Sequence, residues 1–332
     1  MKNLIILSVI TAICTSCFED HADLIPDRGL NGEPSGAVIN TNVLDINGET
    51  LTLSLDVFVV DGQGNFAGGL TGSNFDVESI SILFGDSIVF TNTQVGASRT
   101  SSKGSYAASL LLDQSGSITN TDPDNSRIEA AKIFCGALGS SDYALVSSFT
   151  DDYPTDLLVH TDYTQDTATL NSSLNALLYR EGGGTPLYWS SYIMVGYTEE
   201  NAPGANKAII LFTDGQDTEG GVSIQQLTDY ASDMNVQIYT IGLSRDVDFG
   251  VLSTIAANTG GAFMWAEETE QLITMFGTLG DLLSGNALYY QTLWEANISS
   301  GVWSSNTSFV AEMVITLADG SQFTVPFEVK IP

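Results

Sequence analysis

Between residues 105 and 285 the sequence alternates between short apolar runs and longer segments with apolar residues at helical spacing. This order constrains the fold most, because strands that alternate with helices form a mainly parallel sheet covered by helices on both faces. The expected strands are 107–112, 144–149, 157–160, 208–212, 236–242 and 262–265, and the expected helices are 125–138, 170–179, 186–200, 224–235, 249–258 and 269–283.

A different pattern flanks this region on both sides. Residues 37–104 and 286–332 contain short alternating apolar runs separated by glycine turns, which is typical of antiparallel strands with one solvated face. Neither block is large enough to bury its apolar face alone. We therefore expect the two blocks to pair in one antiparallel β-sandwich, with residues 105–285 inserted as a separate domain. Two separate small sheets are the alternative.

The N-terminus has the features of a secretion signal. Lys2 precedes a short apolar run in residues 1–16, and Cys17 follows small residues. This arrangement resembles the lipobox of bacterial lipoproteins, in which such a cysteine carries lipid, although Cys14 stands where Leu or Val is usual. Ordinary secretion is the alternative. Residues 17–36 are rich in Pro and Gly and are expected to be a tether.

The charge is strongly unbalanced, with 10 Lys and Arg against 40 Asp and Glu and a formal net charge of -30. Such a surface repels phosphates, which argues against nucleic acid as a partner. After removal of the signal segment, which contains Cys14, only Cys17 and Cys135 would remain. With Cys17 lipidated, Cys135 has no partner for a disulfide, and its place on an apolar helix face predicts a buried thiol.

Oxygen-bearing side chains follow two of the expected strands. Asp113, Ser115 and Ser117 come directly after one, and Asp214 follows another. Thr185 precedes Pro186 at an expected helix start. Ligands of parallel sheets bind outside the carboxyl ends of the strands, so we expect these side chains to meet. Hard oxygen donors suit Mg²⁺, Mn²⁺ or Ca²⁺.

Asp113-x-Ser115-x-Ser117, Thr185 and Asp214 resemble, without departure, the metal-ion-dependent adhesion site of von Willebrand factor type A domains. The resemblance covers residues 105–285 and implies a Rossmann-like, doubly wound sheet. It also implies that the two serines bind the cation directly, and that Thr185 and the aspartates bind it directly or through water. Residues 59–75 resemble the β-sandwich segment that precedes this domain in bacterial surface proteins.

Several other residues have competing interpretations. Asp122 and its neighbours could hold calcium, but acids before a helix more often cap it. His160, on an expected edge strand, is expected to be structural. Three aromatics, Tyr188, Trp189 and Tyr192, either line the rim behind Thr185 or cover the core.

These features predict a lipoprotein of the outer membrane, exposed at the cell surface, which binds a carboxylate of a protein or polysaccharide through a divalent cation. The lipid would be its only contact with the membrane, and a secreted or periplasmic protein is the alternative location. A scaffold for envelope assembly or secretion is the alternative function, and metal-assisted hydrolysis is a less favoured one. We expect no enzyme activity, because the sequence has no nucleophile elbow, zinc-binding His pair or phosphate loop, and only two histidines.

Overall fold

The computed structural model describes residues 29–81, 87–100, 102–204 and 206–332. The expected signal segment and Cys17 lie outside these residues. Among the described residues, no helix is both long enough and apolar enough to cross a membrane.

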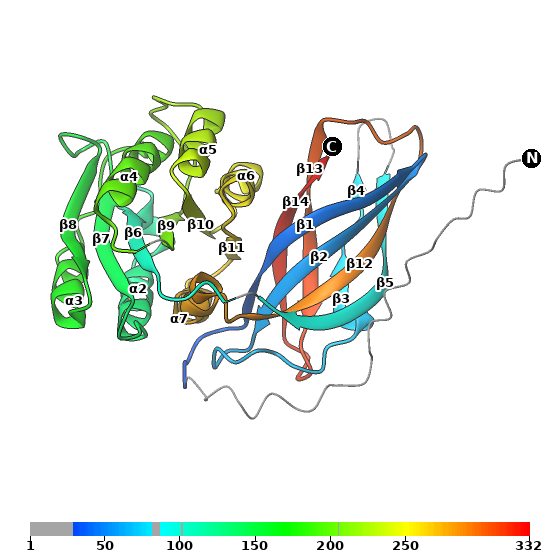
Figure 1. Cartoon of the computed structure of the whole chain (residues 1–332), viewed down its shortest axis with the longest axis horizontal. Helices are drawn as coiled ribbons and strands as arrows, with labels where there is room; N and C mark the ends of the chain where they lie inside the picture. Colours follow the sequence, from blue (N-terminus) through cyan, green and yellow to red (C-terminus); the bar gives the residue numbers. More distant parts are fainter. Residues whose placement is uncertain (1–28, 82–86, 101, 205) are drawn as a thin grey trace, which may run out of the picture.

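A mainly parallel sheet forms the middle of the chain, as the alternation predicted (Figure 1). Its parallel strands lie in the order β11-β10-β9-β6-β7, and β8 pairs antiparallel with β7 at the edge. Near-continuous apolar runs suit these strands because helices bury both faces of the sheet. The strands are β6 (Ala107–Asp113), β7 (Tyr143–Phe149), β8 (Leu157–Thr164), β9 (Lys207–Thr213), β10 (Val236–Leu243) and β11 (Phe263–Ala266).

Two hydrophobic cores hold the helices on the sheet. One core lies beneath α2 (Ser126–Gly136), α3 (Thr167–Asn175) and α7 (Gln271–Ser284). The other lies beneath α4 (Leu187–Asn201), α5 (Ile224–Asp233) and α6 (Phe249–Thr259). The α/β fold expected from the sequence is therefore confirmed.

The helices differ from the expected ones in two places, the bounds of α3 and an additional turn. The helix expected at 170–179 is α3, which begins at Thr167 because Asp166 accepts a hydrogen bond from Ala168 N and caps it. It ends at Asn175, four residues earlier than expected. A single turn, α1 (Ile118–Thr121), was also not expected and follows Ser117 directly.

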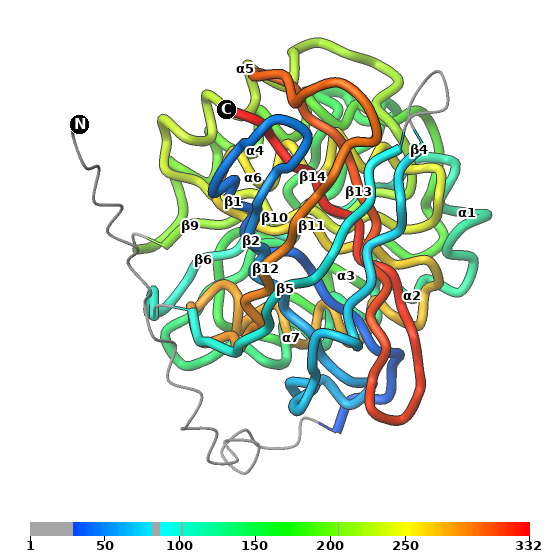
Figure 2. The backbone as a smooth tube through the Cα atoms, turned by 90° about the vertical axis from the view of Figure 1, so that its right-hand side faces the viewer, coloured from blue at the N-terminus to red at the C-terminus, as the bar shows by residue number. Residues whose placement is uncertain are grey.

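The flanking segments form one sandwich with its own core. One sheet has the order β4-β5-β12-β2-β1, and the facing sheet has the order β14-β13-β3. Figure 2 shows β12 running between β2 and β5. The expected pairing of the late strands with the early ones is confirmed. The strands are β1 (Ser35–Asn47), β2 (Thr50–Val60), β3 (Phe75–Val77), β4 (Ile80–Ser81), β5 (Ser87–Arg99), β12 (Leu288–Ile298), β13 (Thr307–Thr316) and β14 (Gln322–Ile331), with a 3-10 turn at Gly72–Asn74.

Strand β1 joins the two parts of the molecule. It pairs with β2 along its length, and near its start Ala37 and Val38 pair with Met264 and Phe263 of β11. Within the described residues, the two regions therefore share one sheet of eleven strands. The tether was expected to extend to residue 36, but residues before Ser35 already contact α7: Thr274 Oγ1 donates to Glu33 O at 2.6 Å.

Candidate metal centre

The first loop of the candidate site begins where β6 ends, at Asp113. This side chain is 0% exposed. Its Oδ1 accepts a hydrogen bond from Ser115 N at 2.8 Å, and its Oδ2 accepts one from Thr213 Oγ1 at 2.6 Å. Thr213 is the last residue of β9, so the contact joins the carboxyl ends of two parallel strands.

Hydroxyl contacts bring Asp214 to the same place. Ser115 Oγ and Ser117 Oγ lie 3.1 Å apart, and Ser117 Oγ donates to Asp214 Oδ1 at 2.8 Å. Thr121, on α1, donates to the other carboxylate oxygen of Asp214. Four of the five predicted residues are thus brought together by direct contacts.

Thr185 lies in the loop that docks on this group. The loop is attached by two backbone hydrogen bonds, Gly116 N to Gly183 O at 3.0 Å and Gly182 N to Gln114 O at 2.9 Å. Thr185 is buried, and its backbone N donates to Thr218 Oγ1 at 2.8 Å. Its hydroxyl makes no hydrogen bond to any described residue, so its lone pairs are available to a ligand.

The electrostatics of the two carboxyl groups favour a cation. Burial, and secondly the charge of Asp214, raises the pKa of Asp113 to about 6, against the hydrogen bonds from Ser115 and Thr213. Burial also raises the pKa of Asp214, while Thr121, Ser117 and the charge of Arg127 lower it. Two buried carboxyl groups that repel each other would both be stabilised by a positive ion between them.

The chemistry of the donors fits such an ion. No three His, Cys, Asp or Glu side chains gather into a metal cluster within the described residues. The candidate set has only two carboxylates, and hydroxyls supply the rest. An all-oxygen set suits Mg²⁺, Mn²⁺ or Ca²⁺, which prefer hard ligands.

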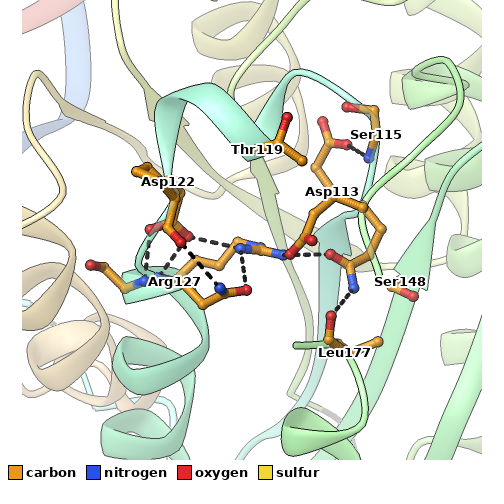
Figure 3. A network of polar contacts seen from close by, with 12 residues as sticks. Asp113, Ser115, Thr119, Asp122, Arg127, Ser148 and Leu177 are labelled. Carbon is orange, nitrogen blue, oxygen red and sulfur yellow. Dashed lines mark hydrogen bonds and ion pairs between the residues drawn. The ribbon is translucent and has the colours of Figure 1, made fainter. Parts of the chain in front are cut away.

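The sequence did not indicate the buried polar network below these loops, which Figure 3 shows. Arg127 is 0% exposed and forms ion pairs with Asp122 at 2.9 Å and Glu181 at 2.6 Å. Asp122 also accepts from the backbone N of Ser126 at 2.7 Å and of Arg127 at 3.1 Å. These contacts favour the capping interpretation of Asp122 over a second calcium site.

The other residues singled out in the sequence have structural contacts. His160 Nε2 lies 2.8 Å from Ser148 Oγ, and Tyr188 N donates to the side chain of Asp217 at 3.0 Å at the start of α4. Tyr192 stacks on Tyr230 with ring centroids 4.5 Å apart. Of the three aromatics named in the sequence analysis, Trp189 is the most exposed, at 36%, while Tyr188 and Tyr192 pack against the core.

Comparison with known proteins gives a family match for the middle of the chain. The family description "von Willebrand factor type A domain" matches residues 109–278. No curated protein matches the sequence significantly.

Several solved structures are similar at low identity. Proximal thread matrix protein 1 from the mussel byssus has 16% identity and a TM-score of 0.45, covering 62% of this chain and 50% of the mussel chain. A von Willebrand factor type A protein from Catenulispora acidiphila has 13% identity and a TM-score of 0.45, covering 91% and 74%. The pilus adhesin SpaC from Lactobacillus rhamnosus GG has 11% identity and a TM-score of 0.46, covering 77% and 48%. The chain thus spans about half the length of the mussel protein.

Proposed function

Because the chain belongs to the von Willebrand factor type A domain family, we propose that it binds an acidic ligand through a divalent cation. The residues that would hold the cation are Asp113, Ser115, Ser117, Thr185 and Asp214. The ligand would be a protein or polysaccharide that offers a carboxylate. We propose a role in adhesion or recognition, without catalysis.

The donor set explains why such a site would attract an outside carboxylate. When bound, the cation would supply positive charge and a coordination position open to a partner. The chain contributes three neutral hydroxyls and only two carboxylates, so much of that charge stays uncompensated. On a protein of net charge -30, this gives a local attraction for an acid that the surrounding surface opposes.

The observation that carries the proposal is the contact of Ser117 Oγ with Asp214 Oδ1 at 2.8 Å. The two residues are 97 positions apart in the sequence. They lie together because β6 and β9 are parallel neighbours whose carboxyl ends meet at one edge.

Isothermal titration calorimetry of the protein with MgCl2, MnCl2 and CaCl2 tests the site. We expect binding of at least one ion, and a loss of about tenfold or more in affinity for Ser117→Ala, because a direct ligand is removed. Ser305→Ala, an exposed serine on the sandwich, is the matched control. Flat titrations with all three ions would contradict the proposal.

A pull-down from native envelopes, with and without a chelator, tests the ligand. We expect partners that are retained with the cation and lost with the chelator. Partners that are retained equally in both conditions would count against a cation-mediated contact.

We further propose that Cys17 carries lipid and anchors the protein in the outer membrane, facing outward. Metabolic labelling with a fatty acid should mark the wild-type protein and not Cys17→Ala. Protease added to intact cells should remove a surface-exposed protein. Survival of the protein would favour the alternative of a periplasmic scaffold for envelope assembly or secretion, and recovery in the medium would favour secretion.

A further inference from the structure

Arg127 is a fully buried cation beneath the candidate metal centre. Its guanidinium donates to Asp122 through Nη1 and to Glu181 through Nη2, and both carboxylates are almost completely buried. A charge in this position costs several kcal/mol unless it is paired and hydrogen-bonded. The pair with Glu181 holds α2, which carries Arg127, to the loop that carries Thr185, and the pair with Asp122 lies in the turn before α2.

The same guanidinium also contacts the first metal-binding loop. Nη2 donates to Gln114 Oε1 at 2.5 Å, and Gln114 lies between Asp113 and Ser115. Gln114 is itself fixed on three sides. Its Nε2 donates to Leu177 O at 2.8 Å, its backbone N donates to Phe149 O at 3.0 Å, and its backbone O accepts from Gly182 N at 2.9 Å.

We propose that Arg127 is the positioning residue of the metal centre. Through Gln114 and Glu181 it holds the Thr185 loop against the Asp113–Ser117 loop before any ion binds. The role in cation binding rests on the proposed function. The docking of the two loops on each other does not depend on it.

The geometry requires arginine at this position. One planar guanidinium donates to four side chains on three different segments: Asp122 and Asn125 before α2, Glu181 in the Thr185 loop, and Gln114. Lysine carries a compact point charge on a flexible stem and has no fork to span these acceptors. A neutral side chain would leave two buried carboxylates without a counter-ion.

A double-mutant cycle for cation affinity tests the proposal. The variants are Glu181→Gln, Thr185→Ala and the combination, titrated with MnCl2 and MgCl2 by calorimetry. We expect Glu181→Gln to weaken binding by about tenfold, as supporting residues of metal sites do. In the Thr185→Ala background, Glu181→Gln should lower the affinity by less than about twofold, because the hydroxyl that Glu181 helps to position is absent.

The matched control is Glu267→Gln, which breaks the exposed pair of Arg245 and Glu267 at 3.2 Å and should leave affinity unchanged. Arg127→Lys completes the set where it folds, and its affinity should be no higher than that of Glu181→Gln, because lysine cannot contact Gln114 and Glu181 together. If Glu181→Gln lowers the cation affinity by about tenfold in both the wild-type and the Thr185→Ala background, or lowers it in neither, the proposal is overturned.

Amide exchange measured by NMR without any cation separates this inference from the proposed function. We expect the amides of Gly182 and Gly116, which join the two loops, to exchange faster in Glu181→Gln than in the wild type or the control. If the wild-type protein binds no cation, the proposed function fails. The exchange data alone then test whether Arg127 holds the two loops together. Unchanged exchange at both glycines would refute the positioning role.

Discussion

Asp113 is fully buried beside a second carboxyl group, and this position has an energetic cost when no cation is bound. Its pKa is raised to about 6, above the value expected in the unfolded chain. A raised pKa adds stability below the unfolded value, and that stability is lost as the pH rises through about 6. At neutral pH Asp113 is therefore charged in both states, and this charge is less favourable in the native state than in the unfolded chain.

Replacing this charge should stabilise the protein while removing the proposed cation binding. We expect Asp113→Asn to raise the free energy of unfolding by about 1 kcal/mol at pH 7 in chelator, because one of two repelling carboxylates becomes neutral. The same variant should lose cation binding. Urea denaturation at pH 7 and pH 5 measures the free energy of unfolding, and the difference between Asp113→Asn and the wild type should shrink at pH 5. Exposed Asp76→Asn is the control, and a destabilised Asp113→Asn variant would contradict the argument.

Cys135 gives a second prediction at this scale. The residue is fully buried in the core beneath α2, and burial raises the pKa of its thiol to about 12. Because only the thiolate reacts, a form that begins after Cys17 should not react with a disulfide reagent while folded. Its labelling rate in increasing urea should follow unfolding measured by fluorescence. Fast labelling of the native protein would show that the helix opens locally.

The five predicted metal ligands were readable from the sequence because each follows a strand or precedes a helix at a fixed spacing. Whether they bind a cation stays a prediction. Arg127 was not readable, because a charged residue on a helix normally points to solvent. Its partner Glu181 is 54 positions away, and no local pattern indicates that pairing. The buried thiol at position 135, by contrast, followed from its apolar neighbours and is confirmed.

At the scale of elements, the loop of Gly182, Gly183 and Gly184 sets the position of Thr185. Gly183 has a φ of +78°, and a Cβ there would overlap the side chains of Asp151 and Thr150. Gly184 N donates to Asp151 Oδ1 at 2.5 Å, so the loop passes close to this acidic neighbour. Three consecutive glycines permit that close approach.

Gly183→Ala should therefore displace the loop and the hydroxyl of Thr185. We expect cation affinity to fall by about tenfold or more, with a loss of about 1–2 kcal/mol in stability. Gly301→Ala is the matched control, because its φ is +86° and nothing lies within 4 Å of its Cβ position. It should lose similar backbone energy without losing affinity. Equal affinities for both variants would show that the glycines serve stability alone.

Strand β1 has a weak strand signal in the sequence. It contains Asn40, Asn42, Asp45 and Asn47, and such residues are depleted in strands. It forms because its neighbours fix it: β2 pairs along its length, and β11 pairs with its buried start. Tertiary pairing decided this strand, whereas the strands of the parallel sheet are apolar enough to be recognised alone.

For the whole molecule, the decisive feature is that the middle domain leaves and re-enters the sandwich at one place. Strands β5 and β12 pair as far as Arg99 and Leu288, and Thr100 N donates to Ala287 O at 2.9 Å. The core of the sandwich consists entirely of residues outside the inserted domain. As expected from the small size of the two flanking blocks, the middle domain is an insertion. All of the sandwich core therefore lies outside residues 105–285.

Replacing residues 102–285 by a short glycine-containing turn should thus leave a folded sandwich. Strands β5 and β12 would become a hairpin, and the sandwich core would be complete. The remaining tryptophans are Trp294 and Trp303, and Trp294 is almost fully buried, so its fluorescence should shift in one cooperative urea transition. Circular dichroism should show strands with little helix. A chain ending at residue 285 is the contrasting variant, since it lacks β12, β13 and β14 and should expose the sandwich core. A non-cooperative transition in the first variant would mean that the contact of β1 with β11 is needed to hold the sandwich together.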